Sequence, residues 1–168
     1  MATTLSGAPA GTTAGARVRA IQSRAAGFLA AHSVTALRVS LGVVFLLFGA
    51  LKLFPGVSPA ESLVMRTIDT LTLGVVSGQT AVFMTAVVEL VIGITLTTGF
   101  AVRAGLVVLA GAMVGIMSPL VLFAGDLFPG GTPTLAAQYV IKDIVLVAAA
   151  AVVAARSLGA RLVVRDAR

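Results

Sequence analysis

Four long apolar stretches, separated by short polar or glycine-rich segments, dominate the chain. They cover about residues 34–54, 80–100, 104–124 and 135–155. Each can form a helix across the hydrocarbon core of a bilayer, which is about 30 Å thick and takes about 20 helical residues. Apolar residues in these stretches do not alternate with polar ones, as they would in a membrane barrel. The pattern therefore predicts four membrane-spanning helices.

A shorter helix is predicted between the first two spans. Pro55 and Gly56 end the first span, and Ser58 and Glu61 have the spacing of a capping box. We expect this helix over about residues 59–76, with its apolar face on the membrane surface or over the bundle.

The chain divides into three predicted parts. Residues 1–32 form the N-terminal part, in which 1–16 are small or polar and expected to be disordered, and 16–31 carry apolar residues at helical spacing. The second half of this part is therefore an expected amphipathic helix on the inner leaflet. Residues 33–157 hold the four spans, and residues 158–168 form a basic cytoplasmic tail.

Composition places the chain among membrane proteins. Of the 168 residues, 58% are apolar and only 11% are charged, so a soluble domain would expose large apolar patches. The predicted fold class is all-α, a membrane-spanning four-helix bundle with one extra interfacial helix after the first span. Its main partner is the lipid bilayer.

The net charge of +6 is interpreted as an orientation signal. With a cytoplasmic N-terminus, Lys52, Arg66 and Lys142 lie outside, and the other nine basic residues lie inside: Arg17, Arg19, Arg24, Arg38, Arg103, Arg156, Arg161, Arg165 and Arg168. This distribution follows the positive-inside rule and predicts that both termini are cytoplasmic. We expect no nucleic-acid partner, because no basic surface interleaved with aromatic residues is present.

Few residues suited to catalysis or metal binding are available. Cysteine is absent, which excludes disulfides, thiol redox chemistry and iron–sulfur ligation. His32 is the only histidine, so paired-histidine haem ligation and a zinc site lack ligands. No catalytic residue, metal site or cofactor site is therefore predicted.

Besides Arg38, four charged residues lie within the predicted spans: Lys52, Glu89, Lys142 and Asp143. Glu89 lies about 13 Å below the outer end of its span, and Lys142 and Asp143 lie about 10 Å below theirs. The four charges sum to zero, which suits a buried cluster because paired ions cost less than single ones in a low dielectric. Such a cluster either locks the helices in register or forms a proton relay or a polar head-group site, and the sequence leaves both open.

Three polar residues share faces with these charges and are secondary candidates. Gln138 and Tyr139 lie one helical turn before Lys142 and Asp143, respectively. Arg38 lies on the same stripe as Lys52 but nearer the inner face, where it is expected to anchor the helix at the interface.

Small residues mark helix faces that can pack closely. Gly42 and Gly49 lie on the Arg38–Lys52 stripe, and Gly111 and Gly115 form a small-xxx-small pair in the third span. We expect both sets to lie in helix–helix contacts.

Three segments resemble a known family. LRVSLGVVFLLFGALKLFP (37–55) and VELVIGITLTTG (88–99) resemble the first two helices of DoxX-like membrane proteins, and QYVIKDIVLVAAA (138–150) is closest to their YkgB-type branch. The resemblance covers about residues 35–158. It implies a four-helix protein of the bacterial inner membrane, associated with respiratory or oxidative-stress chemistry, and it allows quinone as a ligand. The lack of cysteine departs from members whose role rests on thiol chemistry.

Two functional hypotheses follow. The first is a non-catalytic subunit or scaffold of an oxidoreductase system, which predicts a redox-enzyme partner and allows a homo-oligomer. The second is a small transporter or proton-coupled permease in which Glu89 titrates. Four spans leave little room for a substrate path, and no nucleophile–base arrangement or phosphate loop is present. The subunit hypothesis is therefore preferred.

Overall fold

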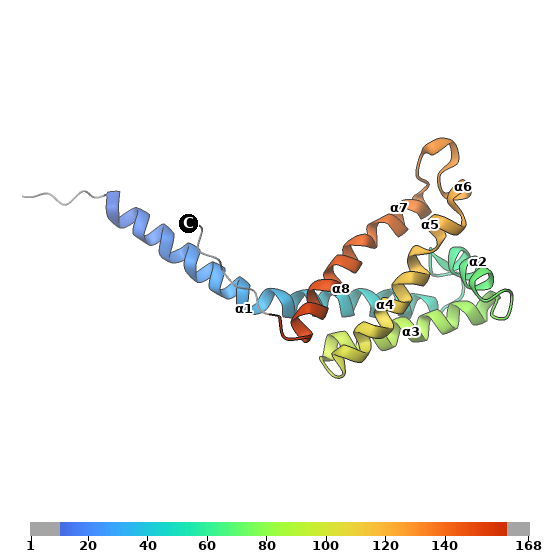
Figure 1. Cartoon of the computed structure of the whole chain (residues 1–168), viewed down its shortest axis with the longest axis horizontal. Helices are drawn as coiled ribbons and strands as arrows, with labels where there is room; N and C mark the ends of the chain where they lie inside the picture. Colours follow the sequence, from blue (N-terminus) through green and yellow to red (C-terminus); the bar gives the residue numbers. More distant parts are fainter. Residues whose placement is uncertain (1–10, 161–168) are drawn as a thin grey trace, which may run out of the picture. The chain divides into compact units, whose positions relative to one another are not determined.

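The computed structural model of the chain describes residues 11–160, with the backbone alone for residues 11–14. All regular structure in this part is helical (Figure 1). Four spans are long and apolar enough to cross a membrane: α1 (Gly11–Lys52), α3 (Gly78–Thr98), α4 (Val102–Met117) with α5 (Pro119–Leu122), and α7 (Leu135–Lys142) with α8 (Ile144–Ser157). The other segments are α2 (Glu61–Leu71), α6 (Ala124–Leu127) and the 3-10 turn η1 (Pro129–Gly131). The predicted all-α membrane bundle is confirmed.

The chain divides into an N-terminal unit, residues 1–33, and a membrane unit, residues 34–168. In the N-terminal unit, helix α1 begins at Gly11, so residues 11–16 are helical where the sequence predicts disorder. Adding residues to an existing helix avoids the cost of nucleation, which explains the earlier start. The prediction for residues 1–10 lies outside the described residues, as does that for residues 161–168 of the tail.

Glycines let α1 and α3 pack backbone against backbone in the membrane unit. A methyl group added at Gly42 would lie 2.6 Å from the Thr97 nitrogen and 2.9 Å from the Gly93 carbonyl oxygen. A methyl group added at Gly93 would lie 2.8 Å from the Leu46 nitrogen. Only glycine fits at such short distances, so the glycine stripe of the first span faces the second span.

Two apolar clusters hold the membrane unit together. The larger one draws buried side chains from all four spans: Leu41, Phe45, Ile92, Leu96, Leu109, Met113 and Val153. It lies toward the end of the bundle that carries Arg38 and the α3–α4 turn, here called the Arg38 end. The smaller one consists of Phe123, Leu127 and Ala137, with Leu63 of α2 packed against it. It lies at the opposite end, here called the Lys52 end.

Helix α2 packs against α3 and α5 at the Lys52 end (Figure 1). The capping box expected at its start is wrong, because Ala60 is the N-cap and the Ser58 hydroxyl is buried without a partner among the described residues. The Glu61 carboxylate instead accepts hydrogen bonds from the Gly56 nitrogen, at 2.6 Å, and from Gln79 Nε2, at 2.5 Å. Glu61 thus ties the end of α1 to the start of α3.

Helix α2 is also shorter than the sequence predicts, because it ends at Leu71. Gly74 takes a left-handed conformation with φ of 83°, and its N–H donates to the Asp69 carbonyl oxygen at 2.8 Å. This bond and the left-handed conformation of Leu73, with φ of 53°, end the helix as a Schellman motif.

The third and fourth spans are interrupted. The third changes from α4 to α5 at Ser118, as expected from Pro119, which has no N–H to donate. The fourth changes from α7 to α8 at Asp143, whose N–H donates to the Val140 carbonyl three residues back, at 3.0 Å. As a result α7 buries Ala137 and Val140, whereas α8 buries Val153 on a different face.

The glycine contacts predict opposite effects for two matched substitutions. Gly42→Ala should lower the free energy of unfolding by about 1–3 kcal/mol, because it forces α1 away from α3. Gly111→Ala should be neutral or stabilising by up to about 1 kcal/mol, because nothing lies within 4 Å of the added methyl group. Unfolding by SDS titration from mild detergent micelles measures both, and equal effects would contradict the α1–α3 contact.

Candidate functional site

Lys52 and Glu89 form a buried ion pair between α1 and α3. Lys52 Nζ lies 2.9 Å from Oε1 and 2.6 Å from Oε2 of Glu89, so one ammonium engages both carboxylate oxygens. Their side chains are only 4% and 6% exposed. The Phe48 ring lies beside the pair, with its centroid 5.9 Å from Lys52 Nζ. This pair forms the centre of the candidate site.

Helix geometry brings these two side chains together. Gly42 contacts Thr97 while Gly49 contacts Glu89, so α1 and α3 run antiparallel. Side chains on a helix tilt toward its N-terminus. The Lys52 side chain therefore reaches back along α1, and the Glu89 side chain reaches toward the α3 start, so the two converge from opposite directions.

Arg38 does not join this pair but binds the other end of α3. Its guanidinium donates to the Leu96 carbonyl oxygen and, at 3.5 Å, to the Thr97 carbonyl oxygen. These carbonyl groups belong to the last turn of α3, where they have no intrahelical partner and carry negative partial charge. Arg38, expected only to be an interfacial anchor, caps the second span.

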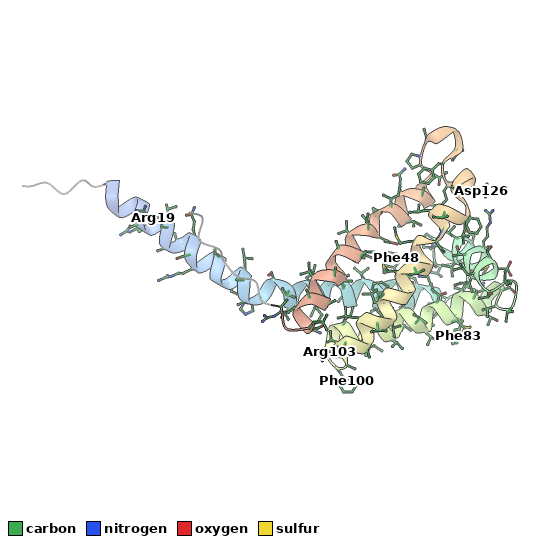
Figure 2. All side chains as sticks on the ribbon, viewed as in Figure 1. Arg19, Phe48, Phe83, Phe100, Arg103 and Asp126 are labelled. Atoms are coloured by element: carbon green, nitrogen blue, oxygen red, sulfur yellow. The ribbon has the colours of Figure 1, made fainter. Side chains whose placement is uncertain are left out.

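A second arginine has the same role on α8. Arg103 donates through Nη2 and Nε to the Ser157 carbonyl oxygen, at 2.9 and 3.2 Å (Figure 2). From the sequence, Arg103 is predicted only to be a basic residue on the inner side of the membrane. Arg103 lies at the start of α4. A helix that runs antiparallel to α4 ends beside this start, so the sequence position of Arg103 indicates contact with the last carbonyl groups of such a helix.

Lys142 and Asp143 are arranged differently from the buried pair. Lys142 is exposed, which means that the rest of the chain does not cover it, and its Nζ lies 4.0 Å from the Tyr139 ring centroid. Asp143 is half-buried and lies within electrostatic reach of Glu89 and Lys52. Gln138 is exposed and its Nε2 donates to the Pro133 carbonyl oxygen at 3.3 Å.

The expectation of a single buried cluster of four charges is therefore corrected. Lys52 and Glu89 are buried and paired, whereas Lys142 points away from them because α7 buries the opposite face, which carries Ala137. Within the described residues, neither Lys142 nor the Asp143 carboxylate has an ion-pair or hydrogen-bonding partner through its side chain.

Arg66 and Asp126 form another ion pair, which the sequence pattern does not predict. Arg66 of α2 lies 2.6 Å from Oδ2 of Asp126 on α6, and its guanidinium lies over the Phe123 ring at 4.0 Å from the centroid. Figure 2 labels Asp126. Both side chains of the ion pair are more than half exposed, at 55% and 63%. This contact joins α2 to the loop after the third span, and its energy is modest because exposed pairs are screened.

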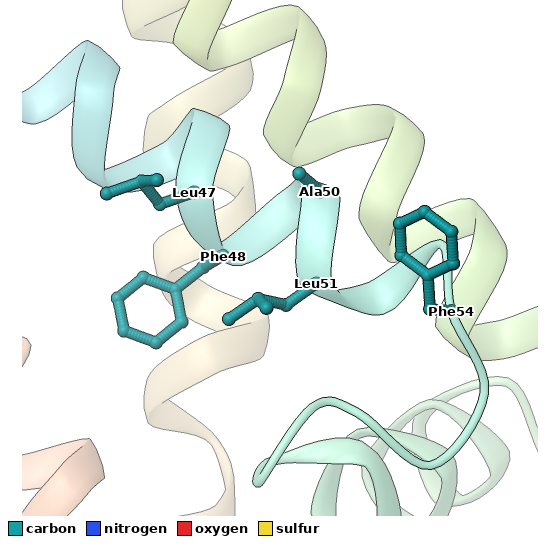
Figure 3. A pocket seen from close by; sticks show the side chains of 5 residues that line it. All are labelled: Leu47, Phe48, Ala50, Leu51 and Phe54. Atoms are coloured by element: carbon teal, nitrogen blue, oxygen red, sulfur yellow. The ribbon is translucent and has the colours of Figure 1, made fainter.

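A groove on α1 borders the buried pair. Leu47, Phe48, Ala50, Leu51 and Phe54 line an open apolar groove of about 410 Å³ (Figure 3). Phe48 belongs to both the groove and the surroundings of Lys52. The groove is thus a lipid-accessible apolar surface with a charged pair behind it.

Residues 33–125, more than half of the chain, match the family model described as DoxX. The matched region contains Arg38, Lys52 and Glu89 and ends before Lys142 and Asp143. No significant match is found among curated proteins or among solved structures.

The buried pair predicts strong coupling between two substitutions. Glu89→Leu alone should lower the free energy of unfolding by about 3–5 kcal/mol, because it leaves the Lys52 ammonium buried without a counter-charge. Combining it with Lys52→Met should bring stability back to near wild type, since both desolvated charges are then gone. SDS titration of the single and double variants measures this coupling. Asp69→Asn, at an exposed position on α2, is the control and should change stability by less than about 0.5 kcal/mol. Additive effects of the two substitutions would rule out the pair as a stabilising unit.

Proposed function

Because the chain belongs to the DoxX family and is a small integral membrane protein, we propose that it is a non-catalytic subunit or scaffold of a respiratory or oxidative-stress oxidoreductase system. The proposal includes the bacterial inner membrane as location and cytoplasmic positions for both termini, on the strength of the basic-residue distribution. It also includes a closer relation of the last helix to the YkgB-type branch.

The observation that carries the proposal is the exposed face of the third span. Val107, Val114 and Val121 recur on this face at intervals of seven residues and are 73%, 73% and 83% exposed. Gly111 and Gly115 lie between them, and nothing in the described chain comes within 4 Å of a methyl group added at either. The small-xxx-small pair thus faces away from the bundle.

Such a face suits a transmembrane helix of another subunit. Helices associate in lipid through close packing, and small residues at i and i+4 let two backbones approach. A helix surface that contacts only lipid has no need of glycine, which lowers helix stability by about 1 kcal/mol relative to alanine. We therefore assign this face to the redox partner, with a second copy of the chain as the competing occupant.

The buried ion pair fits a scaffold better than a transporter. Both oxygens of Glu89 are engaged by Lys52, and the pair lies away from the exposed surface. A proton-coupled permease would have to break this pair in every cycle, with one charge left unpaired in a low dielectric. The pair is better suited to holding α1 against α3 while a partner binds elsewhere.

Quinone, a ligand that the family resemblance allows, does not fit the charged residues well. A quinone head group offers carbonyl oxygens, which need donors. The Lys52 ammonium is already saturated by Glu89. Lys142 is an exposed donor, but the neighbouring Asp143 carboxylate needs a donor of its own, which a carbonyl cannot supply. No step of the proposed function is assigned to a quinone.

Affinity purification in mild detergent tests the proposal. We expect a stoichiometric oxidoreductase subunit with the wild-type chain, reduced at least about tenfold by the double change Gly111→Leu and Gly115→Leu, because the larger side chains prevent close helix approach. Val91→Leu, on the exposed face of α3, is the matched control and should retain the partner. Recovery of a homo-oligomer without another protein, also lost in the double variant, would assign the face to a second copy and overturn the subunit proposal.

A further inference from the structure

The turn between α2 and α3, residues 72–77, places an unfavourable residue at the end of α2. Leu73 occupies the left-handed position of the Schellman motif, with φ of 53°. This position usually carries glycine, because a side chain in the left-handed region crowds the following carbonyl oxygen. Leu73 therefore costs free energy that glycine would not. A leucine at this position is explained if its side chain makes a favourable contact.

The described chain covers little of this side chain. Leu73 is 92% exposed, and Val75 in the same turn is 84% exposed. Hydrogen bonds hold the turn itself: the Val76 N–H donates to Thr72 Oγ1 at 3.0 Å, and the Val75 N–H donates to the Thr72 carbonyl oxygen at 3.1 Å. A bonded turn thus presents two aliphatic side chains outward. The contact that offsets the cost of Leu73 therefore comes from outside the chain.

The position of the turn along the chain places it at the membrane interface. Helix α3 begins at Gly78, directly after the turn, and its 21 residues extend about 31 Å, close to the thickness of the hydrocarbon core. Gly78 is therefore level with the edge of that core, at the Lys52 end. Val75 precedes Gly78 by three residues, so their Cα atoms are at most about 11 Å apart. The interfacial layer adds about 5–8 Å on each side, which brings the turn within reach of lipid.

The surroundings of the turn favour lipid over a protein partner. Residues 70–88 contain no charged residue, so the turn continues the uncharged sequence of the second span without a break. Two aliphatic side chains offer far less than the roughly 800 Å² that each partner buries in a stable protein interface. The bilayer needs no such area, because the four spans already hold the chain in it. Lipid is therefore the occupant that fits this surface.

We propose that the α2–α3 turn is a lipid anchor, in which Leu73 and Val75 insert into the acyl-chain boundary of the leaflet at the Lys52 end. Transfer of the leucine side chain from water into lipid offsets the cost of its backbone conformation. The anchor holds the end of α2 at the interface, while the Arg66–Asp126 pair joins α2 to α6. Insertion requires no anionic head group, because the turn carries no charge. This inference does not depend on a redox partner.

Spin labelling at single cysteines tests the proposal, because the chain has no cysteine of its own. A nitroxide at Val75→Cys is compared, in phosphatidylcholine nanodiscs, with one at Val91→Cys on the exposed face of α3 and one at Asp69→Cys on the exposed surface of α2. Oxygen concentrates in lipid and a charged nickel complex stays in water, so the ratio of their collision rates reports the surroundings of the label. We expect the Val75→Cys ratio to shift from the Asp69→Cys value toward the Val91→Cys value.

Substitution of Leu73 in the labelled Val75→Cys chain tests the contribution of the leucine. Leu73→Asn should return the ratio toward the Asp69→Cys value, because asparagine tolerates the left-handed conformation but is costly to place in an apolar environment. Leu73→Met is the matched control. It keeps an apolar side chain of similar size and should leave the ratio unchanged.

Three outcomes would overturn the proposal. A Val75→Cys ratio equal to that of Asp69→Cys would place the turn in water. Low collision rates with both reagents would show that a protein, and not lipid, covers the turn. An unchanged ratio after Leu73→Asn would exclude Leu73 as the anchor. The Val75→Cys chain keeps Leu73, so its ratio decides between lipid, water and protein even if the Leu73→Asn chain does not fold.

Discussion

The membrane unit depends on one buried contact between opposite charges. Either charge of the Lys52–Glu89 pair, placed alone among apolar helices, would cost several kcal/mol, whereas together they form a neutral, doubly bonded unit. Lys52 is the last residue of α1, and Glu89 lies in the middle of α3, so the contact determines how far α1 slides along α3. Gly49 lets the two helices approach beside Glu89 to a separation that alanine would strain, and Lys52 contacts Glu89 from the same end of α1. Helix packing and charge pairing therefore require each other.

The other end of the same helix pair is fixed by a different kind of electrostatic contact. Both α3 and α8 end at the Arg38 end, where their last carbonyl groups carry negative partial charge. Arg38 donates to α3 and Arg103 donates to α8, so each cation neutralises the terminus of an antiparallel neighbour. Helix α1 is thus bound to α3 at Arg38 and at Lys52, which lie about 21 Å apart along the helix axis. Two polar anchors at this separation fix the register of an otherwise featureless apolar contact.

The sequence predicts these features unequally, for physical reasons. Span positions follow from apolar length alone, and the proximity of Lys52 and Glu89 follows from depth and from the cost of leaving either unpaired. The helix that Gly111 contacts cannot be predicted from the sequence. Two small residues four positions apart give the same pattern whether they face the bundle or another subunit. The outward position of Lys142 does not follow either. The fourth span buries different faces in α7 and α8, so a periodicity taken over the whole span cannot tell which face of α7 is covered. The change of face occurs at Asp143, where a single three-residue hydrogen bond replaces the regular one.

The two pairs of charges in the membrane unit illustrate how sequence position limits what a charge can do. Lys52 and Glu89 are far apart in the chain and lie on different helices, so folding can bring them face to face and use them for stability. Lys142 and Asp143 are neighbours on one helix, and the 100° rotation between adjacent residues keeps their side chains apart. They bring the same net charge of zero and attract each other along the fourth span, but among the described residues neither joins that span to another helix through an ion pair. Opposite charges that are distant in the sequence and meet in the core therefore join two helices, whereas adjacent charges on one span do not.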